Sequence, residues 1–135
     1  MTLSTVPYAL VVDDNALILM DACDILNAAG FRFYEASTGD AAKLLLMDHA
    51  EEVTLLLSDV EMPGDTDGFA LARHVAMHWP WIEIVIVSGN AEPGPGSMPT
   101  KATFLRKPFS RETIHTHLRN TLPDHRKPEP LRRMA

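Results

Sequence analysis

The feature that most constrains this chain is a short apolar run at residues 54–58, which ends on a single acid, Asp59. Met62 and Pro63 follow at once, and a turn-forming segment with two glycines comes next. An apolar run of this length between turn residues is typical of a strand buried in a parallel sheet. Asp59 would then stand at the carboxyl end of that strand, where open α/β sheets bind their ligands.

Strand-like and helix-like segments alternate along the rest of the chain. Strands are predicted at 8–12, 31–36, 53–58, 81–87 and 102–106, and helices at 16–29, 38–47, 68–78 and 110–122. In the second helix, Leu44 and Leu45 are expected to face the core. The alternation predicts βαβ units, a parallel sheet with helices on both faces, and right-handed crossovers. The expected fold class is therefore α/β.

One segment breaks the alternation. Residues 89–100 contain three prolines and three glycines, and these residues prevent a stable helix. An irregular loop, or at most one helical turn, is predicted there. The helix expected between the fourth and fifth strands is therefore missing or vestigial.

Length, charge and cysteine content exclude several classes of protein. The 135 residues suffice for one domain, assigned to 1–122, and a proline-containing tail at 123–135 is expected to be disordered. The net charge of −6 makes nucleic acid a poor partner, so no DNA-binding domain is expected. A single cysteine, the lack of a leader peptide and the lack of an apolar run of about 20 residues favour a cytoplasmic protein without a membrane anchor.

Chemically useful side chains stand at the carboxyl ends of four predicted strands: Asp13 and Asp14, Asp59, Ser88 and Lys107. Those ends share one edge of a parallel sheet, so these residues should converge. Carboxylates ~4 Å apart repel by about 1 kcal/mol per pair in water and about 4 near a protein surface. A hard cation such as Mg²⁺ relieves this repulsion. The ammonium of Lys107 and the hydroxyl of Ser88 are suited to bind phosphoryl oxygens. Together these residues fit the transfer of a phosphoryl group to a carboxylate.

Four short motifs in this order resemble the receiver domain of two-component response regulators. They are Val11-Val12-Asp13-Asp14, Asp59 with Met62-Pro63 and Asp67-Gly68, Ser88-Gly89, and Lys107-Pro108-Phe109. The resemblance extends over roughly residues 7–122. It implies a flavodoxin-like receiver fold, which is a five-stranded, doubly wound parallel sheet of strand order 2-1-3-4-5. The loop at 62–68 is slightly longer than is common in that family.

The resemblance also implies a phosphoacceptor and its metal ligands. Asp59 would take the phosphoryl group from a sensor histidine kinase or a phosphotransfer protein. Asp14 would bind Mg²⁺ directly and Asp13 chiefly through water. The Asp59 carboxylate and the main-chain carbonyl of Glu61 would complete the ligand set.

The same resemblance implies roles for three further residues and the conformation of one peptide bond. Lys107 and Ser88 would contact the phosphoryl group. Ser88 and Phe104 would change position together as the switch. The peptide bond between Lys107 and Pro108 is expected to be cis.

The leading hypothesis is thus a stand-alone, single-domain response regulator that changes its protein contacts on phosphorylation or relays the phosphoryl group. It would not be an enzyme beyond its own phosphorylation and dephosphorylation. Two alternatives remain open: a docking module that kept the fold but not the chemistry, and an aspartyl-phosphate hydrolase with Glu61 as general acid–base. The cognate kinase, the downstream protein, the phosphoryl lifetime and homodimer formation are left open by the sequence.

Overall fold

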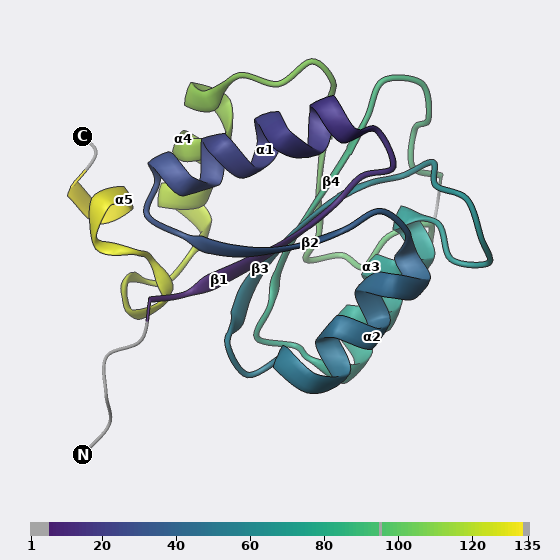
Figure 1. Ribbon diagram of the computed structural model, residues 1–135, viewed down its shortest axis with the longest axis horizontal. Helices are drawn as coiled ribbons and strands as arrows, with labels where there is room; N and C mark the ends of the chain where they lie inside the picture. The colour runs from purple at the N-terminus through teal and green to yellow at the C-terminus, as the bar shows by residue number, and fades with distance from the viewer. Residues whose placement is uncertain (1–5, 95, 134–135) are drawn as a thin grey trace.

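The computed structural model describes residues 6–94 and 96–133, which form one five-stranded parallel sheet with helices on both faces (Figure 1). In chain order the elements are β1 (Tyr8–Val12), α1 (Ala16–Ala28), β2 (Arg32–Ala36), α2 (Gly39–His49), β3 (Val53–Asp59), α3 (Gly68–His78), β4 (Glu83–Ser88), β5 (Thr103–Arg106), α4 (Arg111–Thr121), the 3₁₀ helix η1 (Asp124–Arg126) and α5 (Glu129–Arg133). The strand order is β2-β1-β3-β4-β5. The predicted fold class and strand order are confirmed.

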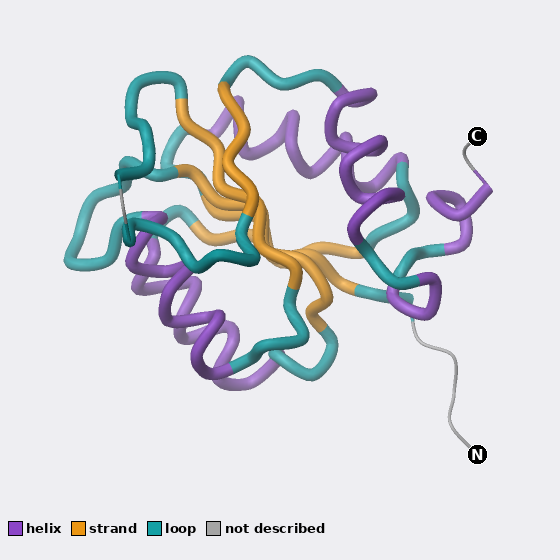
Figure 2. The backbone as a smooth tube through the Cα atoms, turned by 180° about the vertical axis from the view of Figure 1, so that it is seen from behind, coloured by secondary structure: helices purple, strands orange, loops and turns teal. Residues whose placement is uncertain are grey.

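The central strands are buried on both faces because alternate side chains point to opposite sides of a strand. Ala9 and Val11 of β1 belong to one core cluster, which includes residues of α1 and α4. Leu10 and Val12 belong to the other cluster, which includes residues of α2 and α3. Figure 2 shows the twisted sheet between these two helical layers. Every residue of β3 is buried, as its central position requires.

The helix boundaries follow from capping residues that the sequence displays. The side chain of Asn15 accepts hydrogen bonds from the backbone N–H groups at the start of α1, and Ser110 does the same for α4. Gly30 follows α1 with a φ of 99°, a conformation that glycine adopts without strain. None of the helices in the described part of the chain has the length and apolar character that a membrane span requires.

The second helix turns a different face to the core from the one predicted. Leu44 is 66% exposed, so its predicted inward position is wrong. Ala42 and Leu46 are the buried pair, and a residue midway between positions i and i+4 lies on the opposite side of a helix. Leu45 is half-buried and packs against the core as expected.

The segment between β4 and β5 is irregular, as its prolines and glycines predict. Its described residues, 89–94 and 96–102, form no helix or strand. Two side chains hold it in place: Arg73 of α3 donates to the Ser97 carbonyl at 2.6 Å, and Lys101 of the segment itself donates to the Ile82 carbonyl at 2.8 Å. The helix that the alternation requires at this position is thus replaced by an anchored loop.

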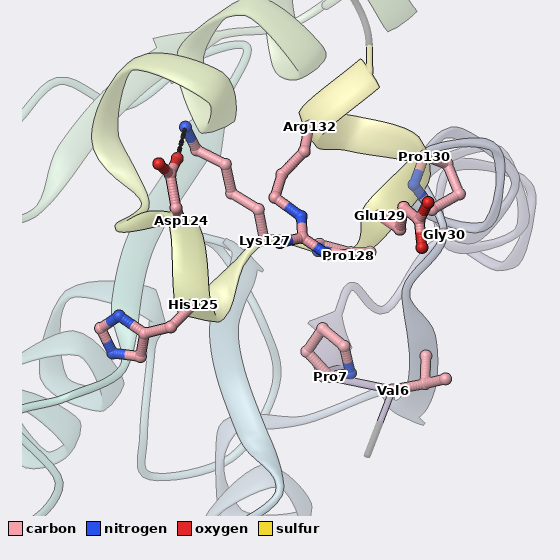
Figure 3. Close-up of a pocket in the computed structure, with 10 residues that line it drawn as sticks. All are labelled: Val6, Pro7, Gly30, Asp124, His125, Lys127, Pro128, Glu129, Pro130 and Arg132. Carbon is pink, nitrogen blue, oxygen red and sulfur yellow. Dashed lines mark hydrogen bonds and ion pairs between the residues drawn. The ribbon is translucent and has the colours of Figure 1, made fainter. Parts of the chain in front are cut away.

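Residues 123–133 differ from the predicted disordered tail, because they form η1 and α5 beside the end of α1. Leu131 has no exposed surface and joins the core cluster of α1 and α4. A Cβ at Gly30 would lie 2.7 Å from Pro130, so the tail packs where only glycine fits (Figure 3). A cavity of about 350 Å³ lies beside this contact. The prediction gave weight to the prolines and charges and overlooked one apolar anchor.

We expect Leu131→Ala to lower the free energy of unfolding by about 2–4 kcal/mol, because it removes a fully buried side chain from a packed core. Urea unfolding of the whole chain measures this change. Arg132→Ala is the matched control, because Arg132 is exposed on the same helix and should change stability by no more than about 0.5 kcal/mol. Equal stability of the two variants would show that the tail is not docked.

Candidate functional site

Three acids meet at the carboxyl edge of the sheet. Asp13 follows β1, Asp14 comes next, and Asp59 is the last residue of β3. One carboxylate oxygen from each lies within 4.8 Å of the others. Asp13 and Asp59 are only 3% and 7% exposed, whereas Asp14 is exposed to solvent. The convergence predicted from strand ends is therefore present in the structure.

Lys107, which follows the edge strand β5, joins this cluster. Its Nζ donates to Asp13 Oδ2 at 2.9 Å and to Asp59 Oδ1 at 3.0 Å. Its backbone N–H donates to the carbonyl of Ser88 at 3.0 Å, which fixes the end of β5 against β4. The predicted cis peptide bond between Lys107 and Pro108 is confirmed. One ammonium group thus bridges the two buried acids.

The pKa shifts reflect this burial and pairing. Burial raises the pKa of the Asp59 carboxyl, the hydrogen bond from Lys107 opposes the rise, and the charge of Asp13 adds to it. Burial alone would lower the pKa of Lys107, but its hydrogen bonds to Asp13 and Asp59 outweigh that effect and raise it. A charged ammonium therefore lies between the two acids at neutral pH.

The backbone around Asp59 is tightly held. The N–H of Val60 donates to the Val87 carbonyl at 3.2 Å, and the N–H of Gly68 donates to the Val60 carbonyl at 2.8 Å. A Cβ at Gly68 would lie 2.1 Å from the Asp59 carbonyl oxygen. Glycine is therefore required at the start of α3, because its backbone contacts the end of β3.

Ser88 lies at the tip of β4, and its hydroxyl is already engaged. It is buried, and Oγ accepts from the backbone N–H of Asn90 at 3.2 Å and of Ala91 at 2.9 Å. Phe104 lies on β5 opposite Ile86 of β4. It is half-buried and packs against the core cluster under α2 and α3. The structure thus places both predicted switch residues on neighbouring strands.

Glu61 lies two residues after Asp59, in the loop that leads to α3, and is exposed. One contact near this loop was missed by the sequence analysis. Thr66 is buried and donates to Asp40 of α2 at 2.7 Å. The residues are 26 positions apart, and no local pattern indicates a hydrogen bond between two such distant segments.

The acid cluster fits a hard divalent cation such as Mg²⁺. All of its donors are carboxylate oxygens, which Mg²⁺ prefers over nitrogen or sulfur. Their mutual spacing within 4.8 Å suits one shared ion. The exposure of Asp14 leaves one side open to the waters that Mg²⁺ retains. Asp13, Asp14 and Asp59 would hold the ion.

The chain is similar to known proteins. The family model of the response regulator receiver domain matches residues 9–119. The sensor kinase CckA of Brucella abortus (strain 2308) is 33% identical over 116 residues, which are 84% of this chain and 12% of that protein. The chain therefore corresponds to only a small part of that relative.

Two solved structures are also similar. The receiver domain of the hybrid histidine kinase CckA has 28% sequence identity and a TM-score of 0.73, with 86% of this chain and 99% of that one covered. The chemotaxis response regulator CheY4 of Vibrio cholerae has 26% identity and a TM-score of 0.73, with 87% and 100% covered.

Proposed function

This chain belongs to the response regulator receiver domain family, and from that membership we propose that Asp59 accepts a phosphoryl group from a sensor histidine kinase or a phosphotransfer protein. The observation that carries the proposal is the pairing of Lys107 with both Asp13 and Asp59 inside the acid cluster. Asp59 is the acceptor because it is the acid at the tip of the central strand β3, with Lys107 bonded to its carboxylate.

In this reaction a carboxylate oxygen of Asp59 attacks phosphorus, and the bond from phosphorus to the donor nitrogen breaks. The ammonium of Lys107, already bonded to Asp59 at 3.0 Å, is close enough to bond an oxygen of the incoming group. Bound Mg²⁺ would supply charge neutralisation, with Asp13, Asp14, Asp59 and the Glu61 carbonyl as the proposed ligands. The protein's contribution is position and charge, which is the main source of catalysis in phosphoryl transfer.

Ser88 could couple phosphorylation of Asp59 to a conformational change at the protein surface. Its hydroxyl now accepts from the N–H groups of Asn90 and Ala91. If its side chain rotates so that Oγ moves to the phosphoryl group and donates to it, those two N–H groups lose their acceptor, and leaving them unpaired costs free energy. The loop after β4 then rearranges, and Phe104 on the next strand moves with Ser88. We propose that this loop and β5 change the chain's contacts with a downstream protein.

Beryllofluoride with Mg²⁺ tests this switch, because it imitates a phosphoryl group on a carboxylate. We expect the NMR signals of residues 88–91 and of Phe104 to shift in the wild type. In Ser88→Ala the signals of Asn90 and Ala91 start displaced and change little, since their acceptor is already lost. Fluoride and Mg²⁺ without beryllium are the control. An unchanged wild-type spectrum would contradict the proposal.

The proposal includes no turnover of other substrates. The chain would catalyse only its own phosphorylation and dephosphorylation, in the cytoplasm, and the phosphoryl group either alters protein contacts or passes to another protein. A docking module without chemistry makes the opposite prediction, namely that wild type and Asp59→Asn bind the same partner equally with a phosphodonor and Mg²⁺ present. A pull-down with both chains separates the two.

A further inference from the structure

The loop that follows β3 is attached to the start of α2 by the carboxylate of Asp40. Thr66 Oγ1 donates to Asp40 Oδ1 at 2.7 Å, and the backbone N–H of Asp65 donates to Oδ2 at 3.3 Å. Thr66 is only 3% exposed although it lies in a loop. Both oxygens of one side chain therefore hold the same short segment.

The backbones on both sides are shaped for this contact. A Cβ at Gly39 would lie 2.4 Å from the Thr66 carbonyl oxygen, and a Cβ at Gly64 would lie 2.8 Å from Asp40 Oδ2. Gly64 also has a φ of 98°, which favours glycine. Glycines on both segments allow the close approach, so the attachment does not depend on one flexible side chain alone.

Glu61 lies between this attachment and a second one. On its amino side, Val60 is bonded to β4 and to the start of α3. On its carboxyl side, Asp65 and Thr66 are bonded to Asp40. The path of the backbone at Glu61 is thus set from both ends. Loss of either attachment would let the Glu61 carbonyl move relative to the acid cluster.

We propose that Asp40 is a positioning residue for the metal site, because it fixes the loop that carries the Glu61 carbonyl. This inference rests on the proposed function, since it concerns the ion that phosphorylation requires. If Asp40 has this role, its replacement should weaken Mg²⁺ binding and leave the rate of phosphoryl transfer at saturating Mg²⁺ unchanged.

Asp40→Ala tests the proposal through two measurements. Calorimetric titration should show a Kd for Mg²⁺ about threefold to tenfold higher than in the wild type. Removing a group that supports a metal ligand typically weakens metal binding by about tenfold or more, so this change is at or below the lower end of that range. Amide hydrogen exchange of residues 61–66 should be faster in metal-free Asp40→Ala. The rate of phosphorylation by acetyl phosphate should fall at low Mg²⁺ and return to the wild-type rate at saturation.

Variants of Thr66 distinguish the loss of the loop's attachment from the loss of the negative charge of Asp40. Thr66→Val removes the donor and keeps every charge, so it should reproduce the weaker Mg²⁺ binding, and Thr66→Ser should restore it. Asp48→Ala removes an exposed acid at the other end of α2 and should leave the Kd unchanged. An equal effect of Asp48→Ala, or normal Mg²⁺ binding in both Asp40→Ala and Thr66→Val, would overturn the proposal.

The two proposals fail in distinguishable ways. A wild-type chain that binds no Mg²⁺ and takes no phosphoryl group would refute the proposed function, whatever Asp40 does to the loop. A wild-type chain that binds Mg²⁺ and is phosphorylated, with the same Kd and the same loop exchange in Asp40→Ala, would refute only the positioning role.

Discussion

Asp59→Asn should abolish phosphorylation of the chain and leave its fold intact. An amide is not a nucleophile toward phosphorus at neutral pH, so we expect incorporation from acetyl phosphate and Mg²⁺ to fall by at least about a thousandfold. Burial disfavours the charge of Asp59, and Lys107 keeps its bond to Asp13. The free energy of unfolding should therefore change by no more than about 1 kcal/mol. Intact-mass spectrometry and urea unfolding measure both quantities.

Asp48→Asn is the matched control for this variant, because it makes the same chemical change at an exposed acid outside the site. It should take up one phosphoryl group as the wild type does, and a chelator of Mg²⁺ should prevent uptake in both. Undiminished uptake by Asp59→Asn would place the acceptor on another residue, such as Asp13 or Asp14. That result would contradict the proposed assignment of Asp59 as the acceptor.

Lys107→Ala should slow phosphorylation by about a hundredfold or more while the chain stays folded. The ammonium contacts both buried acids, and removing one preorganised donor of this kind from an enzyme's active site lowers the rate by about 10²–10³. The sheet itself does not depend on Nζ, so the far-ultraviolet circular dichroism spectrum should remain that of the folded chain. Without the ammonium, Mg²⁺ becomes the main source of charge neutralisation, and it should stabilise this variant more than the wild type.

Arg111→Ala provides the comparison for Lys107→Ala, because it removes an exposed positive charge four residues away. It should leave the phosphorylation rate within about twofold of wild type, as expected for a screened surface charge. An unfolded Lys107→Ala chain would show that the lysine is structural. A normal rate in the folded variant would remove Lys107 from the phosphoryl site.

The sheet and the acid cluster were predictable because both follow from patterns along single elements. Apolar runs mark buried strands, and parallel strands bring their carboxyl ends to one edge. Asp13, Asp59 and Lys107 could therefore be grouped although they are far apart in the chain. The missing helix between β4 and β5 was predictable for a similar reason, since prolines and glycines act locally.

Features set by contacts between distant segments were not predictable in this way. Leu44 has the residue type of a core position, but the helix turns Ala42 and Leu46 inward instead. Leu131 anchors the tail only because Gly30 leaves room for the neighbouring prolines. The bond between Asp40 and Thr66 joins a helix start to a loop. Periodicity along one element carries no information about such pairs.

Chemical trapping identifies the phosphorylated residue directly. Borohydride reduces an aspartyl phosphate to homoserine, so the wild-type chain can be treated with acetyl phosphate and Mg²⁺, reduced, digested and mapped by mass spectrometry. We expect homoserine at position 59 and unmodified aspartate at positions 13 and 14. Homoserine at another position, or at none, would contradict it.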